Sequence, residues 1–438
     1  MSGLKRQLLK IGTVLGSRGL TRVSQVVAFF LLARVLSPEG FGAYGILTSA
    51  VFLAGQIGNL GLRQSAAYRI GQGKMTDGEA IGAMTVLWPI SSVACGLAVT
   101  FLNRDLFAQM GASSSIALLI ATATILLLTL LQGVFLGRGQ IAYYSTSDAG
   151  PRVAQSIFVA LLWLTGTLTL ASAVWSFTAG FLLLTPLLLW VALKNVRVPL
   201  GAVRQAPDMI RHGFLFALSV FLVTLQGRVG VFFLHGAHGA TDAGQFFAAQ
   251  RANEIFLELA SAVGLVLFSD TARSSNSRQT LIEALRTATS MFVVFLVIGL
   301  VAAFLAPSLV KILLGPKYLP ATDALRILAI GLAPAAAVRI LNSVIAGLGK
   351  PYLSAAIVLG ALVFNAGMCA WLAPSLGPKG AAISLVVAQF IAALTYWFIC
   401  VTHYKIRLQD IMPGKSGQGT GLRSSSEAPV AQYGDARQ

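Results

Sequence analysis

Several arginines of this sequence interrupt long apolar stretches, and their type and position suggest chemistry. A charged side chain at the centre of a bilayer costs about 2.5–3.5 kcal/mol, so such residues face a wet cavity or pair with one another. The excess of arginine over acid predicts a cationic cavity. The arginines are Arg22, Arg152, Arg228, Arg251, Arg326 and Arg339, and the acids in the same stretches are Asp148, Glu254 and Glu258.

Four of these arginines are candidates for binding a ligand. Arg22, Arg228 and Arg339 have no acidic partner on their own predicted helix, whereas Arg251 has an acid three residues later. Arg251 is expected either to bind the ligand or to form a structural ion pair, and Arg152 to pair with the acid four residues before it. A guanidinium group binds phosphate oxygens in pairs and in one plane. A phosphate or diphosphate with polar substituents therefore suits the predicted cavity.

Amide side chains share helical faces with these arginines. Gln25 lies one turn from Arg22, and Asn342 lies one turn from Arg339. Such amides can hydrogen-bond sugar hydroxyl groups, and they can equally join helices to one another. The amides assigned to the substrate site are Gln25, Gln56, Asn59, Asn342 and Asn365.

Two acids are candidates for coupling transport to an ion. Glu254 and Glu258 stand one helical turn apart, and like charges at that spacing disfavour simultaneous ionisation. The hypothesis is that they couple transport to H⁺ or Na⁺.

Neither a metal site nor another cofactor is predicted, since the histidines show no zinc-ligand spacing. The cysteines lie inside apolar runs as packing residues, namely Cys95, Cys369 and Cys400.

The elements that carry these residues are predicted to be transmembrane helices. The chain has 438 residues, of which 56% are hydrophobic and 11% charged, whereas a soluble domain has about a quarter charged residues. A spanning helix needs about 20 apolar residues, so the chain has room for about twelve. The composition therefore predicts an all-α, polytopic membrane protein. It excludes a soluble enzyme and a disordered chain.

The net charge of +17 is explained by the positions of the basic residues. Lys and Arg gather in alternate loops between the predicted spans, as cytoplasmic loops do. This pattern places both termini in the cytoplasm, and anionic lipid headgroups suffice as partners for the charge. No nucleic-acid partner is predicted. The segment 403–438 is expected to be a disordered cytoplasmic tail.

An internal repeat predicts two pseudo-symmetric lobes of six helices each. The segment FLLARVLSPEGFGAY (Phe30–Tyr44) corresponds to FFLHGAHGATDAGQF (Phe232–Phe246), and each joins two apolar helices through a polar turn. Chance similarity between apolar helices is the alternative. The expected lobes are residues 1–194 and 210–402, joined by a cytoplasmic loop over 195–209. Parallel repeats of this kind place a substrate site at the interface between the halves.

Several segments together resemble the polysaccharide-biosynthesis flippases, which belong to a superfamily that also contains the MATE drug exporters. The resemblance covers most of the chain, with one departure. The family often has an Asp two residues after the arginine of the seventh span, whereas here Arg228 is followed by Gly230. The similar segments are FLLARVLSPEGFGAYGI (Phe30–Ile46), GNLGL (Gly58–Leu62), LLGPKYLPATDALRILAIG (Leu313–Gly331), IAGLGKPYLSAA (Ile345–Ala356) and LGPKGAAISLV (Leu376–Val386).

The resemblance implies a transporter rather than an enzyme. It implies a two-lobed bundle that moves an undecaprenyl-diphosphate-linked oligosaccharide from the cytoplasmic to the outer leaflet of the inner membrane by alternating access. Polysaccharide polymerase and export proteins would be its partners. The diphosphate would be held by Arg22, Arg228, Arg251 and Arg339. A MATE-like drug or metabolite:cation antiporter is the alternative, and it would need more acidic residues than this chain has.

Overall fold

The computed structural model of the chain describes residues 19, 21–199, 201–273, 277–348 and 351–403. Within these ranges the chain forms helices joined by short turns and has no β-strand. The predicted all-α class is confirmed. The predicted tail over 403–438 lies outside the described residues, except for His403 at the end of the last helix.

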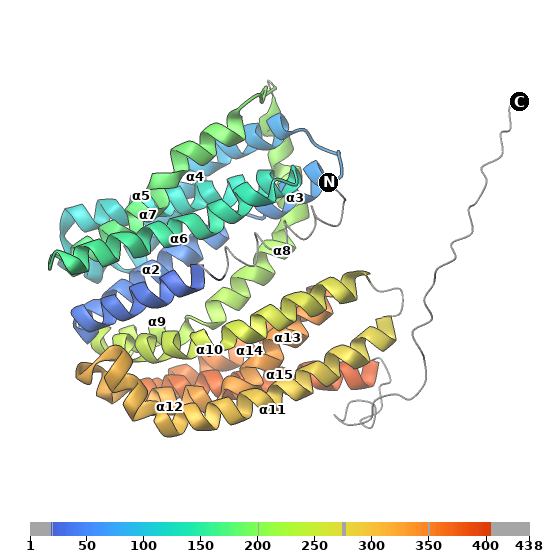
Figure 1. Ribbon diagram of the computed structural model, residues 1–438. Helices are drawn as coiled ribbons and strands as arrows, with labels where there is room; N and C mark the ends of the chain where they lie inside the picture. The colour runs from blue at the N-terminus through green and yellow to red at the C-terminus, as the bar shows by residue number, and fades with distance from the viewer. Residues whose placement is uncertain (1–18, 20, 200, 274–276, 349–350, 404–438) are drawn as a thin grey trace, which may run out of the picture.

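The helices form two bundles, with α8 running between them (Figure 1). The first bundle contains a helix over residues 21–35, α2 (Pro38–Gly58), α3 (Leu62–Gly71), α4 (Asp77–Leu102), α5 (Arg104–Gly137), α6 (Ile141–Leu164) and α7 (Leu170–Leu193). The connection is made by η1 (Ala202–Gln205) and α8 (Ala206–Gln226). The second bundle contains α9 (Val229–His238), α10 (Ala240–Arg273), α11 (Ser277–Leu309), the π-helix η2 (Val310–Leu314), η3 (Pro316–Ala321), α12 (Thr322–Ile330), α13 (Leu332–Gly347), α14 (Pro351–Leu376) and α15 (Pro378–His403).

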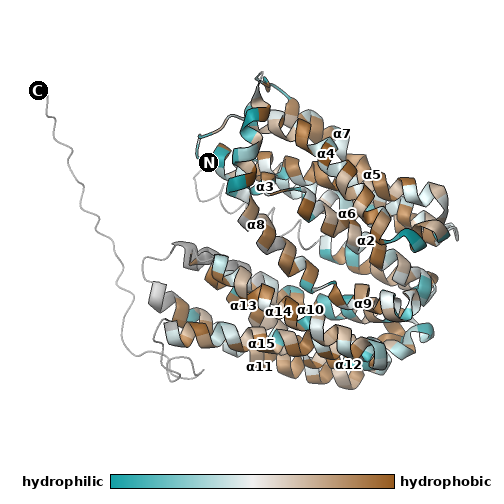
Figure 2. Cartoon of the chain, turned by 180° about the vertical axis from the view of Figure 1, so that it is seen from behind, coloured by the Kyte–Doolittle hydropathy of each residue, from teal (hydrophilic) through white to brown (hydrophobic). Residues whose placement is uncertain are grey.

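The helices are long and apolar enough for a multi-pass membrane protein. Seven described helices meet the length and hydropathy of a membrane span, and the bent pair α12–α13 makes an eighth candidate. The expected number of twelve is not confirmed, because helices such as α6 and α10 carry charged residues that lower their hydropathy. Apolar residues run along the helices of both bundles, and hydrophilic residues gather mainly at helix ends and turns (Figure 2).

The two bundles meet most closely where α2 crosses α10. A side chain at Gly42 would collide with the backbone carbonyl of Ala240, and one at Gly244 would collide with the carbonyl of Pro38. Gly42 and Gly244 occupy the same position in the two repeats, as do Pro38 and Ala240. The contact is therefore reciprocal, as a two-fold relation between the repeats requires.

Basic side chains hold the bundles together at the same end of the molecule. The Lys317 ammonium group donates hydrogen bonds to the carbonyls of Leu36 (2.8 Å) and Val35 (3.3 Å), at the end of the first helix. Arg34 donates to the carbonyl of Ile312 in the π-helix. Each cation therefore satisfies carbonyls at the end of a helix in the other bundle. We call this the closed end of the molecule.

The opposite end is joined mainly through α8. Gly61 and Gly213 bring the backbones of α3 and α8 into direct contact, and Arg69 pairs with Asp208 at 2.9 Å. Farther along, α8 packs against α14 of the second bundle. The stretch 195–209, expected to be a loop, contains η1 and the first residues of α8.

Candidate substrate cavity

A cavity of about 410 Å³ lies between the two bundles, near their middle. The first helix, α2, α6, α7 and α10 all contribute to its wall. Its aromatic residues come from the first helix, α2, α7 and α10, and its charged residues from the first helix, α6 and α10. The aromatic lining residues are Phe29, Phe41, Tyr44, Phe52, Phe177 and Phe247, and the charged ones are Arg22, Arg152, Arg251, Glu254 and Glu258.

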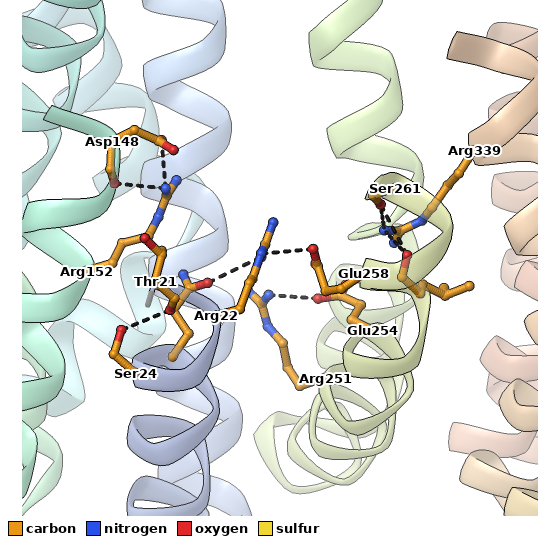
Figure 3. A network of polar contacts seen from close by, with 12 residues as sticks. Thr21, Arg22, Ser24, Asp148, Arg152, Arg251, Glu254, Glu258, Ser261 and Arg339 are labelled. Atoms are coloured by element: carbon orange, nitrogen blue, oxygen red, sulfur yellow. Dashed lines mark hydrogen bonds and ion pairs between the residues drawn. The ribbon is translucent and has the colours of Figure 1, made fainter. Parts of the chain in front are cut away.

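An ion pair joins the first helix to α10 across this cavity. The Nε atom of Arg22 lies 2.9 Å from a carboxylate oxygen of Glu258 (Figure 3). Arg22 also donates to the Oε1 atom of Gln25 at 3.3 Å. The Arg22 side chain stays 56% exposed, so a ligand in the cavity can reach its remaining donors. Arg22 has no acidic partner on its own helix, as predicted, and its acid stands on another helix.

The second acid of α10 lies between two arginines. The carboxylate of Glu254 is 2.8 Å from Arg251 and 3.8 Å from Arg228. The guanidinium carbons of these arginines lie 5.1 Å and 6.0 Å from the ring centroid of Phe247, within cation–π range. The ring and the carboxylate together fix both cations. Arg228, which has no acid on its own predicted helix, therefore takes its acidic partner from α10.

A break between α8 and α9 brings Arg228 to this position. The chain leaves the helical path at Gly227, and the carbonyls at the break need other donors. The Asn365 side chain donates to the carbonyl of Gln226 at 3.3 Å, and Gln250 donates to the carbonyl of Gly227. Asn365, predicted to bind sugar, thus supports the backbone. The role of Gln250 was not predicted.

One face of α6 contributes polar residues that sequence reasoning left out of the site. Arg152 pairs with Asp148 at 2.7 Å, as the spacing predicts, but it also lines the cavity. Gln155 lines it too and donates to the Tyr44 hydroxyl at 2.6 Å. Arg152, Gln155 and Ser156 are spaced by three and four residues, and this spacing was the available signal.

Two predicted residues lie in a second cavity, of about 400 Å³, inside the second bundle. Arg339 donates to the Ser261 hydroxyl at 2.8 Å. Asn342 accepts hydrogen bonds from Ser354 and from the Tyr396 hydroxyl, at 2.6 Å and 3.0 Å. These contacts make Asn342 a helix-joining residue. Glu254 lines both cavities and stands between them.

Three predicted amides are absent from the lining of both cavities, namely Gln56, Asn59 and Asn365. The prediction assumed one continuous helix through Gln56 and Asn59, but α2 ends at Gly58. Asn59 is buried at the break, where its Oδ1 atom accepts from the backbone N–H of Arg63 and its amide donates to Gln64, both at 3.0 Å. It therefore caps the start of α3.

The charges around the two cavities, taken together, leave a positive excess. Among the described residues, five guanidinium groups and three carboxylates line or adjoin these two cavities, so two positive charges are not neutralised. The five are Arg22, Arg152, Arg228, Arg251 and Arg339, and the three are Asp148, Glu254 and Glu258. In the described part of the chain, no cluster of three or more His, Cys, Asp or Glu side chains is placed to hold a metal ion.

Comparison with known families agrees with this architecture. Residues 31–323 match the family described as polysaccharide biosynthesis protein. The chain belongs to this family. No curated protein matches the chain.

Solved structures share the fold at low sequence identity. The lipid II flippase MurJ, in an inward closed conformation, has a TM-score of 0.75 and 15% identity over 91% of this chain and 88% of MurJ. An inward-facing multidrug resistance MATE family transporter has a TM-score of 0.69 and 15% identity over 90% and 98%. A MOP superfamily transporter from Pyrococcus furiosus, described as having a binding pocket of reverse polarity, has a TM-score of 0.62 and 16% identity over 91% and 94%.

These findings define the general class of the protein. The family is that of polysaccharide biosynthesis proteins, and the fold is the multi-pass helical fold of the MATE transporters and the MurJ flippase.

Proposed function

We propose that this protein flips an undecaprenyl-diphosphate-linked oligosaccharide from the cytoplasmic to the outer leaflet of the inner membrane, for synthesis of a surface polysaccharide. The main support is the excess of two positive charges around the central cavity and the adjoining cavity of the second bundle. A diphosphate diester carries two negative charges, which match this excess. An organic cation would be repelled by it. Membership of the polysaccharide biosynthesis family agrees with such a substrate.

In this proposal Arg22 and Arg251 exchange one anion for another. Both line the cavity and are bound to carboxylates, to Glu258 at 2.9 Å and to Glu254 at 2.8 Å. A diphosphate offers the same planar oxygen geometry with more charge, so it displaces the carboxylates. The freed acids then bind H⁺ or Na⁺. Substrate and coupling ion are thereby linked through the same arginines.

The sugar would lie against the aromatic residues of the cavity. Gln25 and Gln155 line the cavity beside the charged network and offer amide groups for hydroxyls. Phe52 and Phe177 provide ring surfaces for the apolar faces of sugar rings, and their centroids lie 5.6 Å apart. We therefore revise the sugar site toward Gln25 and Gln155 and away from Asn342 and Asn365.

The conformation is then one that loads substrate. With both termini in the cytoplasm, the closed end faces outward and the cavity opens toward the cytoplasm. Alternating access requires the closed end to separate and the opposite end to close. Polysaccharide polymerase and export proteins would receive the flipped lipid.

Deletion of the gene tests the proposal, with lipid-linked sugars measured by mass spectrometry and surface polysaccharide measured in parallel. We expect lipid-linked repeat units to accumulate and the polymer to be lost. Complementation with Arg251→Ala should fail, and Arg326→Ala should succeed, because Arg326 pairs with Asp323 outside the cavity. Normal polymer together with a loss of drug resistance would contradict the proposal and favour the antiporter.

A further inference from the structure

A smaller, wholly apolar pocket adjoins the central cavity. Its volume is about 160 Å³, and every residue that lines it is apolar. The first helix, α10, α11, η2 and α12 form its wall. Apolar residues line an enclosed space only when it stays dry or takes an apolar ligand.

The pocket shares part of its wall with the cationic site. Val26 of the first helix and Ile255 of α10 line both spaces. Arg22, Val26 and Phe30 follow one another at four-residue intervals, so they lie on one face of the first helix, about 6 Å apart along its axis. This face changes from cationic to apolar over about 12 Å. A ligand bound there would need a charged group joined directly to an apolar chain.

The size and position of the pocket fit part of a prenyl chain. An apolar cavity of about 150 Å³ holds a six-carbon ring such as benzene, and one isoprene unit has five carbons. Leu309 and Leu313 are only partly buried, and the neighbouring Ile312 is 63% exposed on the apolar surface of the second bundle. The rest of the chain can therefore pass directly from the pocket into the bilayer.

We propose that this pocket binds an isoprene unit near the diphosphate of the substrate. The inference rests on the proposed function, because it takes the diphosphate at Arg22 and Arg251 as its starting point. It adds that the protein recognises the lipid carrier itself and not only its sugar. A substrate with the same headgroup on a short or missing chain would bind less tightly.

Photocrosslinking tests the position of the chain. A diazirine-bearing leucine analogue replaces Leu313 in the purified full-length protein, in liposomes with radiolabelled undecaprenyl diphosphate as the probe. We expect a crosslink that excess unlabelled undecaprenyl diphosphate removes. The same analogue at Ile312 faces lipid, so any crosslink there should resist competition. If the competitor has the same effect on the crosslinks at both positions, the proposal is overturned.

Filling the pocket provides an independent measurement. Ala302 lines it and is 5% exposed, whereas Val297 on the same helix is 56% exposed. Ala302→Phe should weaken undecaprenyl diphosphate binding about tenfold or more, because it removes buried apolar contact, and Val297→Phe should not. Binding of inorganic diphosphate should be unchanged in both variants. If Ala302→Phe slows transport but leaves undecaprenyl diphosphate binding intact, the space serves only helix movement and the inference is wrong.

Inorganic diphosphate separates this inference from the proposed function. If it fails to compete for the undecaprenyl probe, the diphosphate site is wrong whatever the crosslink at position 313 shows. If it competes but the crosslink at position 313 is absent, the diphosphate site is supported and the proposal of a prenyl pocket is contradicted.

Discussion

Gly42 of α2 and Gly244 of α10 hold the same position in the two repeats and lie against each other at the closed end. Each lies beneath a carbonyl of the other helix, from Ala240 and Pro38 respectively, so neither position has room for a side chain. Separation of the bundles at this end must break this contact.

A methyl group at this contact should open the closed end. Gly244→Ala places a Cβ against the carbonyl of Pro38, and overpacking of this kind costs about 1–3 kcal/mol. We expect the population with separated bundles to rise about tenfold. Spin labels at Val35 and Ile312, after removal of the native cysteines, measure the separation. Gly236→Ala is the control, because a side chain there meets open space. Equal label distances in both variants would contradict the prediction.

Loss of the Lys317 ammonium group should have a smaller effect in the same direction. Lys317→Met removes the hydrogen bonds to the carbonyls of Val35 and Leu36. Since Lys317 is exposed, the expected cost is about 1 kcal/mol. The same label pair should show a several-fold rise in the separated form. Lys311→Met, also exposed, should leave the distance unchanged. A change of equal size in the label distance of both variants would mean that surface charge, and not the hydrogen bonds, causes the change.

Removal of the Glu258 charge should strengthen anion binding while it weakens ion coupling. Glu258→Gln releases Arg22 from its ion pair, and pairs this exposed are worth about 0.2–1 kcal/mol. Binding of inorganic diphosphate, measured by calorimetry, should tighten a few-fold. Arg22→Ala should weaken it. Unchanged ion dependence of transport in Glu258→Gln would exclude this acid from coupling.

Replacement of Arg228 by an uncharged residue should destabilise the protein. The Arg228 side chain is only 13% exposed, and loss of one partner of a buried pair costs up to about 3–5 kcal/mol. Because Arg251 still neutralises Glu254, we expect about 2 kcal/mol for Arg228→Met. Thermal unfolding in detergent should show the loss, and Arg228→Lys, which keeps the positive charge beside Glu254, should recover part of it. No recovery in Arg228→Lys would mean that the effect comes from the helix break and not from charge.

Sequence reasoning found the helical class and most of the charged network, but it placed partners only within single helices. Composition and periodicity depend on neighbours along the chain, so they identify spans and show which residues are costly in a membrane. The Arg22–Glu258 and Arg228–Glu254 contacts join different helices, and their register depends on packing. Periodicity also assumes unbroken helices, and so it misplaced Asn59.

The break between α8 and α9 also constrains how the nascent chain is assembled. Gln250 and Asn365, which satisfy the carbonyls of Gln226 and Gly227, are synthesised after the break itself. Until they are in place, an open break in hydrocarbon would cost several kcal/mol, so the segment is most stable as one continuous helix during insertion. It breaks when α10 and α14 pack against it. A nascent chain that ends after α9 therefore lacks the complete site, because Arg228 reaches its final position only after α10 and α14 have been synthesised.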